Sequence, residues 1–247
     1  EVVLGKALSQ VFNTPEPVSE AISLPKIDIE KIRGIIDTSS EGYLDAAQTQ
    51  QLLNAAGIPR VTEVVENSKE KLLAAMDAME FPVVMKVVGP LHKSDAKGVV
   101  LNITSKEEVS KTFDRLMQID SATAVMVQPQ LAGLELFVGV MKEPGFNHTI
   151  LCGLGGIFIE VLNDVSAGLS PISNNEAQQM VQSLRGYKLI QGARGREGVD
   201  ENQFVEIIQR LSALVEAAPE IMEMDINPLI GTRKNIVAVD TRLRVGN

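Results

Sequence analysis

The chain has 247 residues, of which 45% are hydrophobic and 22% are charged, a composition typical of a globular protein. Its formal net charge of −9 argues against a nucleic-acid-binding surface, because phosphate backbones attract clusters of Lys and Arg. No apolar run approaches the roughly 18 to 20 residues of a membrane helix, and the single Cys152 excludes an internal disulfide. We therefore expect a cytoplasmic protein that binds neither nucleic acid nor membranes, with Cys152 as a buried, inert thiol.

The first 40 residues have the composition of an interdomain linker. Pro15, Pro17 and Pro25 stand among polar residues there, with one short amphipathic stretch at 27–36. We expect 1–40 to be a linker together with the tail of a preceding module.

A small α+β lobe is predicted over 41–122. Apolar residues recur at helical spacing in 41–56 and 68–79, and Ser105 with Glu108 forms a capping-box signal for a helix to residue 117. Residues 82–88 and 99–103 have the apolar, β-branched composition of strands.

The remaining residues, 123–247, predict a second lobe that is rich in antiparallel strands. The expected strands are 123–128, 134–141, 149–153, 156–161, 221–227 and 236–242, and the expected helices are 173–184 and 200–218.

The last two strands bring an amide and a carboxylate together. A turn at 231–235 between them sets Asn227 beside Asp240. Magnesium prefers hard oxygen ligands, few protein carboxylates and room for substrate phosphates. On spacing alone, the alternative is a hairpin in which both residues only cap the turn.

Lys86 interrupts an apolar strand, where its ammonium needs a partner such as phosphate, or a route to water along its stem. The polar loop after this strand contains His92, a residue type that can accept and release a phosphoryl group, although most loop histidines do not.

Further candidates lie in the second lobe. Gly155 and Gly156 offer unobstructed backbone N–H groups for a phosphoryl group, with Glu160 close enough to help hold a metal, although glycine pairs usually mark turns. Glu135 suits ribose hydroxyls or is a solvated strand residue. We expect His148 at the surface. Arg194 and Arg196 fit a solvated loop better than an anion site.

Taken together, four sequence blocks resemble the ATP-grasp portion of NDP-forming acyl-CoA synthetases. The blocks are MKVVGPLHKSDAKGV, QLAGLELFVGV, GLGGIFIEVLNDV, and MDINPL with AVDTRL. The match runs from about Glu41 to the end of the chain, and the family is also similar to the β subunit of succinyl-CoA synthetase. The resemblance implies an α+β ATP-grasp fold in which two α+β lobes, preceded by a linker, enclose a nucleotide.

The resemblance also implies roles for the candidate residues. Lys86 is expected to contact the phosphates of ATP or ADP, Asn227 and Asp240 to ligate Mg²⁺ with Glu160 close by, and Gly155–Gly156 to receive the phosphoryl group. The adenine is expected against the hinge segment 127–131, which includes Gln128, Pro129 and Leu131, with Glu135 beside the ribose. His92 corresponds to a second histidine that relays phosphate in some members of the family.

Two departures from the family pattern limit these expectations. Ala96-Lys97-Gly98 stands where the family often has a glycine pair, which puts the relay role of His92 in question. The chain also contains neither a GxGxxG fingerprint for CoA nor a second motif for the primary phosphohistidine. We expect both on an upstream domain or another chain, in an oligomeric assembly.

Three functions are consistent with the sequence. The first is the nucleotide-binding, phosphoryl-transfer component of an enzyme that interconverts acid, CoA and ATP with acyl-CoA, ADP and phosphate. The second is a regulatory ATP-grasp module of a protein-lysine acetyltransferase, with little turnover. The third, a carboxylate–amine ligase, does not need the HKSD block. The sequence does not indicate the acyl group.

Overall fold

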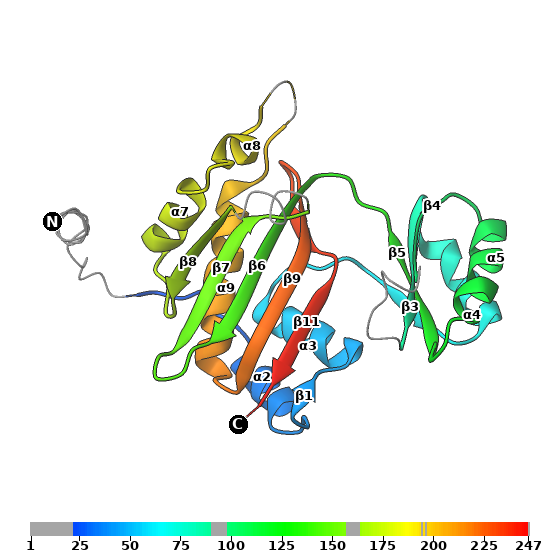
Figure 1. Ribbon diagram of the computed structural model, residues 1–247, viewed down its shortest axis with the longest axis horizontal. Coiled ribbons are helices and arrows are strands. Elements are labelled where there is room, and N and C mark those ends of the chain that lie inside the picture. Colours follow the sequence, from blue (N-terminus) through cyan, green and yellow to red (C-terminus); the bar gives the residue numbers. More distant parts are fainter. Residues whose placement is uncertain (1–21, 90–97, 157–163, 194, 196, 247) are drawn as a thin grey trace, which may run out of the picture.

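Two antiparallel sheets organise the computed structural model, which describes residues 22–89, 98–156, 164–193, 195 and 197–246 (Figure 1). The smaller sheet has the order β2-β5-β3-β4, and the larger sheet has the order β1-β11-β9-β6-β7-β8, with β10 paired to β9. This is the arrangement of two α+β lobes that the family resemblance implied.

The smaller sheet consists of β2 (Val64–Glu66), β3 (Val83–Val88), β4 (Val99–Ile103) and β5 (Ala124–Pro129). Helices α4 (Lys69–Ala75), η1 (Met76–Ala78) and α5 (Lys106–Leu116) cover one face. Because side chains alternate along a strand, Val83, Met85 and Val87 face these helices, and Lys86 points to the other face.

The larger sheet consists of seven strands. They are β1 (Gly42–Tyr43), β6 (Leu134–Lys142), β7 (His148–Leu154), β8 (Val165–Leu169), β9 (Ile221–Gly231), β10 (Ile236–Ala238) and β11 (Thr241–Val245). Its helices are α2 (Ile29–Ile36), α3 (Ala46–Ala56), α7 (Asn174–Gln182), α8 (Tyr187–Gln191) and α9 (Glu201–Ala217). Helices α2, α3, α7 and α9 pack together against one face of the sheet, where the larger core lies (Figure 1). None of the helices described here lies on the opposite face of the sheet, which we call the open side.

Local sequence signals place the helix ends. The Asp45 carboxylate accepts a hydrogen bond from Gln48 N–H, and the Gln48 side chain accepts one from Asp45 N–H, which completes a capping box at α3. Gly57, at φ 69°, ends the helix in the left-handed conformation that glycine tolerates best. None of the helices in the described ranges is long and apolar enough to cross a membrane.

Sheet membership differs from the predicted lobe borders in two places. Strand β5, expected at the start of the second lobe, pairs with β3 and β2 in the smaller sheet. Helix α2, expected within the linker, buries Ile32 in the core of the larger sheet. Arg33 of α2 also donates two hydrogen bonds of 2.8 Å to the Glu220 carboxylate. The predicted borders at residues 40 and 122 therefore do not coincide with the borders between the sheets, because local patterns do not specify pairing partners.

The chain passes between the sheets twice. In the first connection, Val61 N–H donates to Ala238 O (2.9 Å), and Ala238 N–H donates to Pro59 O (2.8 Å). The second connection leads from β5 to β6, where Gln130 N–H donates to Pro82 O (2.9 Å). The first connection, which leads from α3 to β2, is therefore hydrogen-bonded to the end of β10, two residues before Asp240.

Replacing Ile32 by alanine tests whether α2 belongs to the folded core. We expect Ile32→Ala to lower the free energy of unfolding by about 2–5 kcal/mol, because the removed atoms leave a cavity. Ile29→Ala is the matched control, since Ile29 lies on the same helix and is 57% exposed, and we expect it to change stability by about 0.5 kcal/mol or less. Urea unfolding followed by circular dichroism measures both. Equal, small effects would mean that α2 does not contribute to the core.

Candidate functional site

Lys86 and Asp240 meet between the two sheets. Lys86 is only 8% exposed, and its Nζ donates to Asp240 Oδ2 at 3.4 Å. The alternative of a lysine head reaching water is therefore not what the structure shows. The ammonium lies on the face of the smaller sheet opposite to its helices. Its countercharge is the Asp240 carboxylate, which comes from the larger lobe.

The expected pairing of Asn227 with Asp240 is confirmed. Thr241 lies opposite Ile226 in the β9–β11 ladder, and Asn227 N–H donates to Asp240 O at 3.1 Å. An amide oxygen and a carboxylate beside a lysine fit a magnesium ion that takes its remaining ligands from water and phosphate. Among the described residues, no three His, Cys, Asp or Glu side chains gather into a self-sufficient metal site. The role of the pair as metal ligands remains a prediction.

Asp225 and Arg242 extend this polar region and were not chosen as candidates from the sequence. Arg242 lies opposite Asp225 in the ladder. Desolvation raises the pKa of the Asp225 carboxyl, the Arg242 guanidinium lowers it, and the charge of Asp240 raises it further. The signal for Asp225 was its spacing of two from Asn227 on one strand, which places both on the same sheet face.

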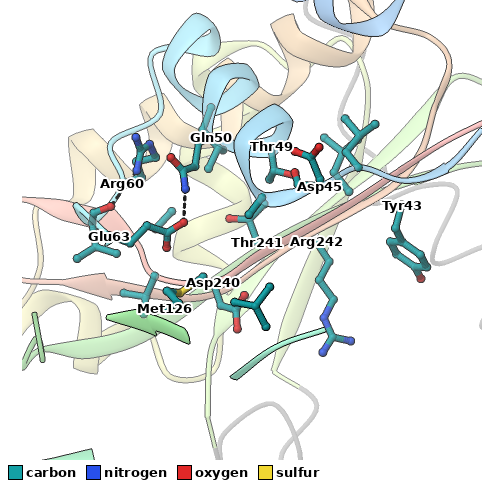
Figure 2. Close-up of a pocket in the computed structure, with 18 of the residues that line it drawn as sticks. Tyr43, Asp45, Thr49, Gln50, Arg60, Glu63, Met126, Asp240, Thr241 and Arg242 are labelled. Atoms are coloured by element: carbon teal, nitrogen blue, oxygen red, sulfur yellow. Dashed lines mark hydrogen bonds between the residues drawn. The ribbon is translucent and has the colours of Figure 1, made fainter. Parts of the chain in front are cut away.

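A pocket of about 620 Å³ lies beside Asp240, lined by α3, the first connection, the end of β3 and residues 238–243. Figure 2 shows Gln50 of α3 reaching towards Glu63, with Asp240, which lies between β10 and β11, on the same side of the pocket as Glu63. Gln50 Nε2 donates to Glu63 Oε1. Burial raises the pKa of the Glu63 carboxyl, and hydrogen bonding to Gln50 and the charges of Arg60 and Lys86 oppose this. Neither Gln50 nor Glu63 was predicted, because they belong to no sequence block.

The expected adenine segment forms the end of β5. Gln128 is 1% exposed, and its Oε1 has no hydrogen-bond partner within the described part of the chain. A buried acceptor without a donor is costly, so this atom fits a ligand that supplies an N–H group. Pro129 ends the strand, and Leu131 is 37% exposed.

Glu135 and the glycine pair lie together at one end of β6 and β7. Gly155 N–H donates to Glu135 O at 2.8 Å. Gly156 has φ 59°, and an added Cβ there would come within 2.2 Å of Glu135 Oε2. The positive φ favours glycine at this position, and a larger residue would also displace the Glu135 carboxylate. The functions predicted for the three residues remain predictions.

Other candidates have different outcomes. His92, Glu160, Arg194 and Arg196 lie outside the described residues. The expectation of a surface His148 was wrong: the side chain is 1% exposed, and its Nε2 lies 2.8 Å from Ile221 O. A distant carbonyl satisfies this ring, which the local turn sequence does not reveal. Cys152 is buried as expected, and burial raises the pKa of its thiol to about 12.

Comparisons with known proteins agree with this geometry. An ATP-grasp domain family model matches residues 36–245. The chain is 34% identical over 227 residues to the ADP-forming acetate–CoA ligase I subunit beta of Pyrococcus furiosus, covering 87% of this chain and 98% of that protein. It is 40% identical over 202 residues to the ADP-forming acetate–CoA ligase II of Archaeoglobus fulgidus, covering 81% of this chain but only 30% of that protein.

A solved structure is also similar, with a TM-score of 0.75 and 31% identity over 89% of this chain and all of that one. It is the dinucleotide-forming acetyl-coenzyme A synthetase 1 of Ca. Korarchaeum cryptofilum in complex with coenzyme A and Mg-AMPPCP. Its phosphohistidine segment is described as pointing towards the nucleotide binding site.

Glu63→Gln tests the electrostatics of the pocket. In the wild type, the raised pKa means that the folded protein keeps this proton to a higher pH than the unfolded chain, whose ordinary value is 4.5. The stabilisation linked to this group is therefore full below that value and is lost as the pH rises through the raised pKa. We expect Glu63→Gln to be more stable than the wild type at pH 7, and the difference to vanish below about pH 4.

Urea unfolding at a series of pH values measures this difference. Glu70→Gln is a control of opposite sign, because hydrogen bonds from its own backbone N–H and from Ser68 lower the pKa of Glu70. We expect Glu70→Gln to lose stability at pH 7 relative to acidic pH. A Glu63→Gln protein that is less stable than the wild type at neutral pH would contradict the assignment.

Proposed function

The chain belongs to the ATP-grasp domain family, and from this premise we propose that it is the nucleotide-binding, phosphoryl-transfer component of an NDP-forming acyl-CoA synthetase. The reaction converts acid, CoA and ATP to acyl-CoA, ADP and phosphate, and runs in both directions. The observation that supports this most strongly is the contact of Lys86 with Asp240, beside Asn227, between the two sheets.

The residues of the site have distinct roles in binding. Lys86 contacts the nucleotide phosphates, while Asn227 and Asp240 would hold Mg²⁺, with Glu160 as a further candidate from the sequence. Gln128, Pro129 and Leu131 contact the adenine, and Glu135 contacts the ribose. When bound, the ion neutralises phosphate charge during transfer.

The phosphoryl group is exchanged with a histidine on a partner. In ATP synthesis, the phosphorus–nitrogen bond of phosphohistidine breaks and a terminal oxygen of ADP forms the new bond to phosphorus. The Gly155–Gly156 segment receives the phosphoryl group, with the backbone N–H of Gly156 as the candidate donor, because Gly155 N–H already donates to Glu135 O. His92 is a candidate for a relay. Lys86 provides positive charge that stabilises the transferring group.

The chemistry on CoA requires a part that this chain does not contain. The chain spans 30% of the Archaeoglobus fulgidus relative and 98% of the Pyrococcus furiosus β subunit. The CoA-binding and phosphohistidine functions therefore reside on further domains or on another subunit, in an oligomer that we place in the cytoplasm. The acyl substrate is determined by that other part.

Nucleotide titration tests the site directly. We expect isothermal calorimetry to show ADP binding that is strengthened by Mg²⁺ in the wild type. Lys86→Ala weakens binding about 10- to 100-fold with or without the ion, because a phosphate contact is lost. Asp240→Ala removes most of the strengthening by Mg²⁺, because a metal ligand is lost.

Two exposed residues provide matched controls for this titration. The side chains of Lys111 and Asp77 are 73% and 78% exposed, and Lys111→Ala and Asp77→Ala should bind like the wild type. Wild-type binding that Mg²⁺ does not affect, or equal binding by all variants, would contradict the proposed site.

Turnover by the complete assembly tests the reaction. With acid and CoA present, we expect the wild type to form ADP from ATP, and Lys86→Ala to be at least about 100-fold slower, because phosphate contact and charge stabilisation are both lost. His92→Asn slows turnover only if the relay operates. The measurement is acid- and CoA-dependent ADP release.

Other outcomes identify the alternatives. Nucleotide binding without acid- and CoA-dependent turnover would support a regulatory module in a protein-lysine acetyltransferase. ATP hydrolysis by the isolated chain that depends on an added amine would support a carboxylate–amine ligase instead.

A further inference from the structure

Strand β8 shows an inverted pattern of polarity. Its sequence is Val-Ser-Ala-Gly-Leu, and the exposed positions are the apolar ones, Val165, Ala167 and Leu169. The small residues face the helices instead, where an added Cβ at Gly168 would lie 2.9 Å from Met180 Sδ. An edge strand of a soluble protein normally presents polar or charged side chains to water.

The apolar exposure continues onto the neighbouring strands. Leu169 lies opposite Thr149, which lies opposite Met141, and Ala167 lies opposite Leu151. Met141 is 49% exposed, Val165 40% and Leu169 53%. We call Met141, Leu151, Val165, Ala167 and Leu169 the apolar face. A contiguous exposed surface of this kind marks an interaction site more often than a surface of scattered hydrophobic residues does.

The apolar face lies on the same side of the sheet as the predicted phosphate site. The row that begins with Ala167 continues across the sheet through Leu151, Gly139 and Asp225 to Arg242. Directly paired residues share a face, and Asp240 is two residues before Arg242 on the same side. Four strand spacings of about 4.8 Å separate β8 from β11, which amounts to about 19 Å.

We propose that the apolar face is the docking surface for the CoA-binding, phosphohistidine-bearing part of the enzyme. This inference rests on the proposed function. The remaining part must contact this chain, because the matched region makes up 30% of a single-chain relative and nearly all of a separate β subunit. The helices occupy the other side of the larger sheet, so the open side is where a partner reaches both the apolar face and the phosphate site.

Docking at this place explains how a short segment of the partner reaches the nucleotide. A body seated on β7 and β8 faces Asp240 across about 19 Å of open sheet, a distance that roughly six extended residues span. The charged residues nearer β11, such as Glu223 and Arg244, pair with each other at 3.2 Å. On this side of the sheet, covering the apolar residues is therefore the change that contributes most to the free energy of binding a partner.

Cysteine labelling of the assembled enzyme tests the proposal. The native Cys152 is buried with a pKa of about 12, so maleimide reports on introduced cysteines. We expect Leu169→Cys to react at least about tenfold more slowly in the assembly than in the isolated chain, because docking covers it. Leu101→Cys is the matched control, since Leu101 is 57% exposed on edge strand β4 of the smaller sheet, and its reactivity should not change.

A second pair of variants measures the energetic effect. Leu169→Lys should weaken assembly with the CoA-binding part by about tenfold or more, whereas Leu101→Lys should not, and both should bind Mg-ADP like the wild type. Equal labelling of the two cysteines, or equal assembly of the two lysine variants, overturns the proposal. Protection of Leu169→Cys in the isolated chain that increases with its concentration also overturns it, because a second copy is then the occupant.

The same samples separate this inference from the proposed function. If the wild type assembles through Leu169 but binds no Mg-nucleotide, the proposed function fails and the docking surface remains. If it binds the nucleotide but Leu169 stays reactive in the assembly, the docking surface fails and the nucleotide site remains.

Discussion

The Lys86 ammonium is the group on which the arrangement of the two lobes depends. A charge that is only 8% exposed needs an opposite charge to offset its lost hydration. Among the described residues on its own side of the smaller sheet, its neighbours are uncharged: Val84, Val88, Val99, Met126 and Gln128. The countercharge therefore comes from the larger sheet, where Asp240 approaches to 3.4 Å. In the absence of a nucleotide, the two charged groups that the proposed ligand needs are held against each other.

The two partners of this ion pair are fixed to different degrees. Backbone hydrogen bonds hold the acid: Asn227 N–H donates to Asp240 O, and Val239 N–H donates to Pro228 O at 3.0 Å. Lys86, by contrast, reaches across on a flexible stem of four methylene groups. In a complex with metal and phosphate, the phosphate would replace Asp240 as the partner of Lys86, and the metal would replace Lys86 as the partner of Asp240. The Asp240 carboxylate could then stay in place while the lysine side chain moves. The interaction that joins the sheets is thus also the one that the ligand replaces.

Local sequence patterns predicted most strands, most helices and the adjacency of Asn227 and Asp240, because alternation, capping boxes and a short turn are local features. They missed β1, β2 and β8, and the expected strand 156–161 lies largely outside the described residues. They did not reveal that β5 pairs in the smaller sheet or that α2 joins the larger core, since pairing partners are set by contacts between distant residues. Glu63 and Gln50 were missed for the same reason: they lie 13 residues apart on different elements and meet only in the folded pocket. His148 was misplaced because the carbonyl that it contacts is 73 residues away.

The two faces of the larger sheet differ in role because helices pack against only one of them. Helices α3 and α9 lie against the inward-facing residues and make that side a core, so the partner surface that we propose lies on the opposite side. On that side, polar residues near β11 are adjacent to Lys86, and apolar residues occupy the β8 edge. On the inward side of β8, α7 packs close to Gly168, where an added Cβ would lie 2.9 Å from Met180 Sδ, but close packing there does not require Val and Leu to point outward. Apolar residues at those outward positions lower the solubility of an isolated chain. They no longer do so when the surface of a partner covers them.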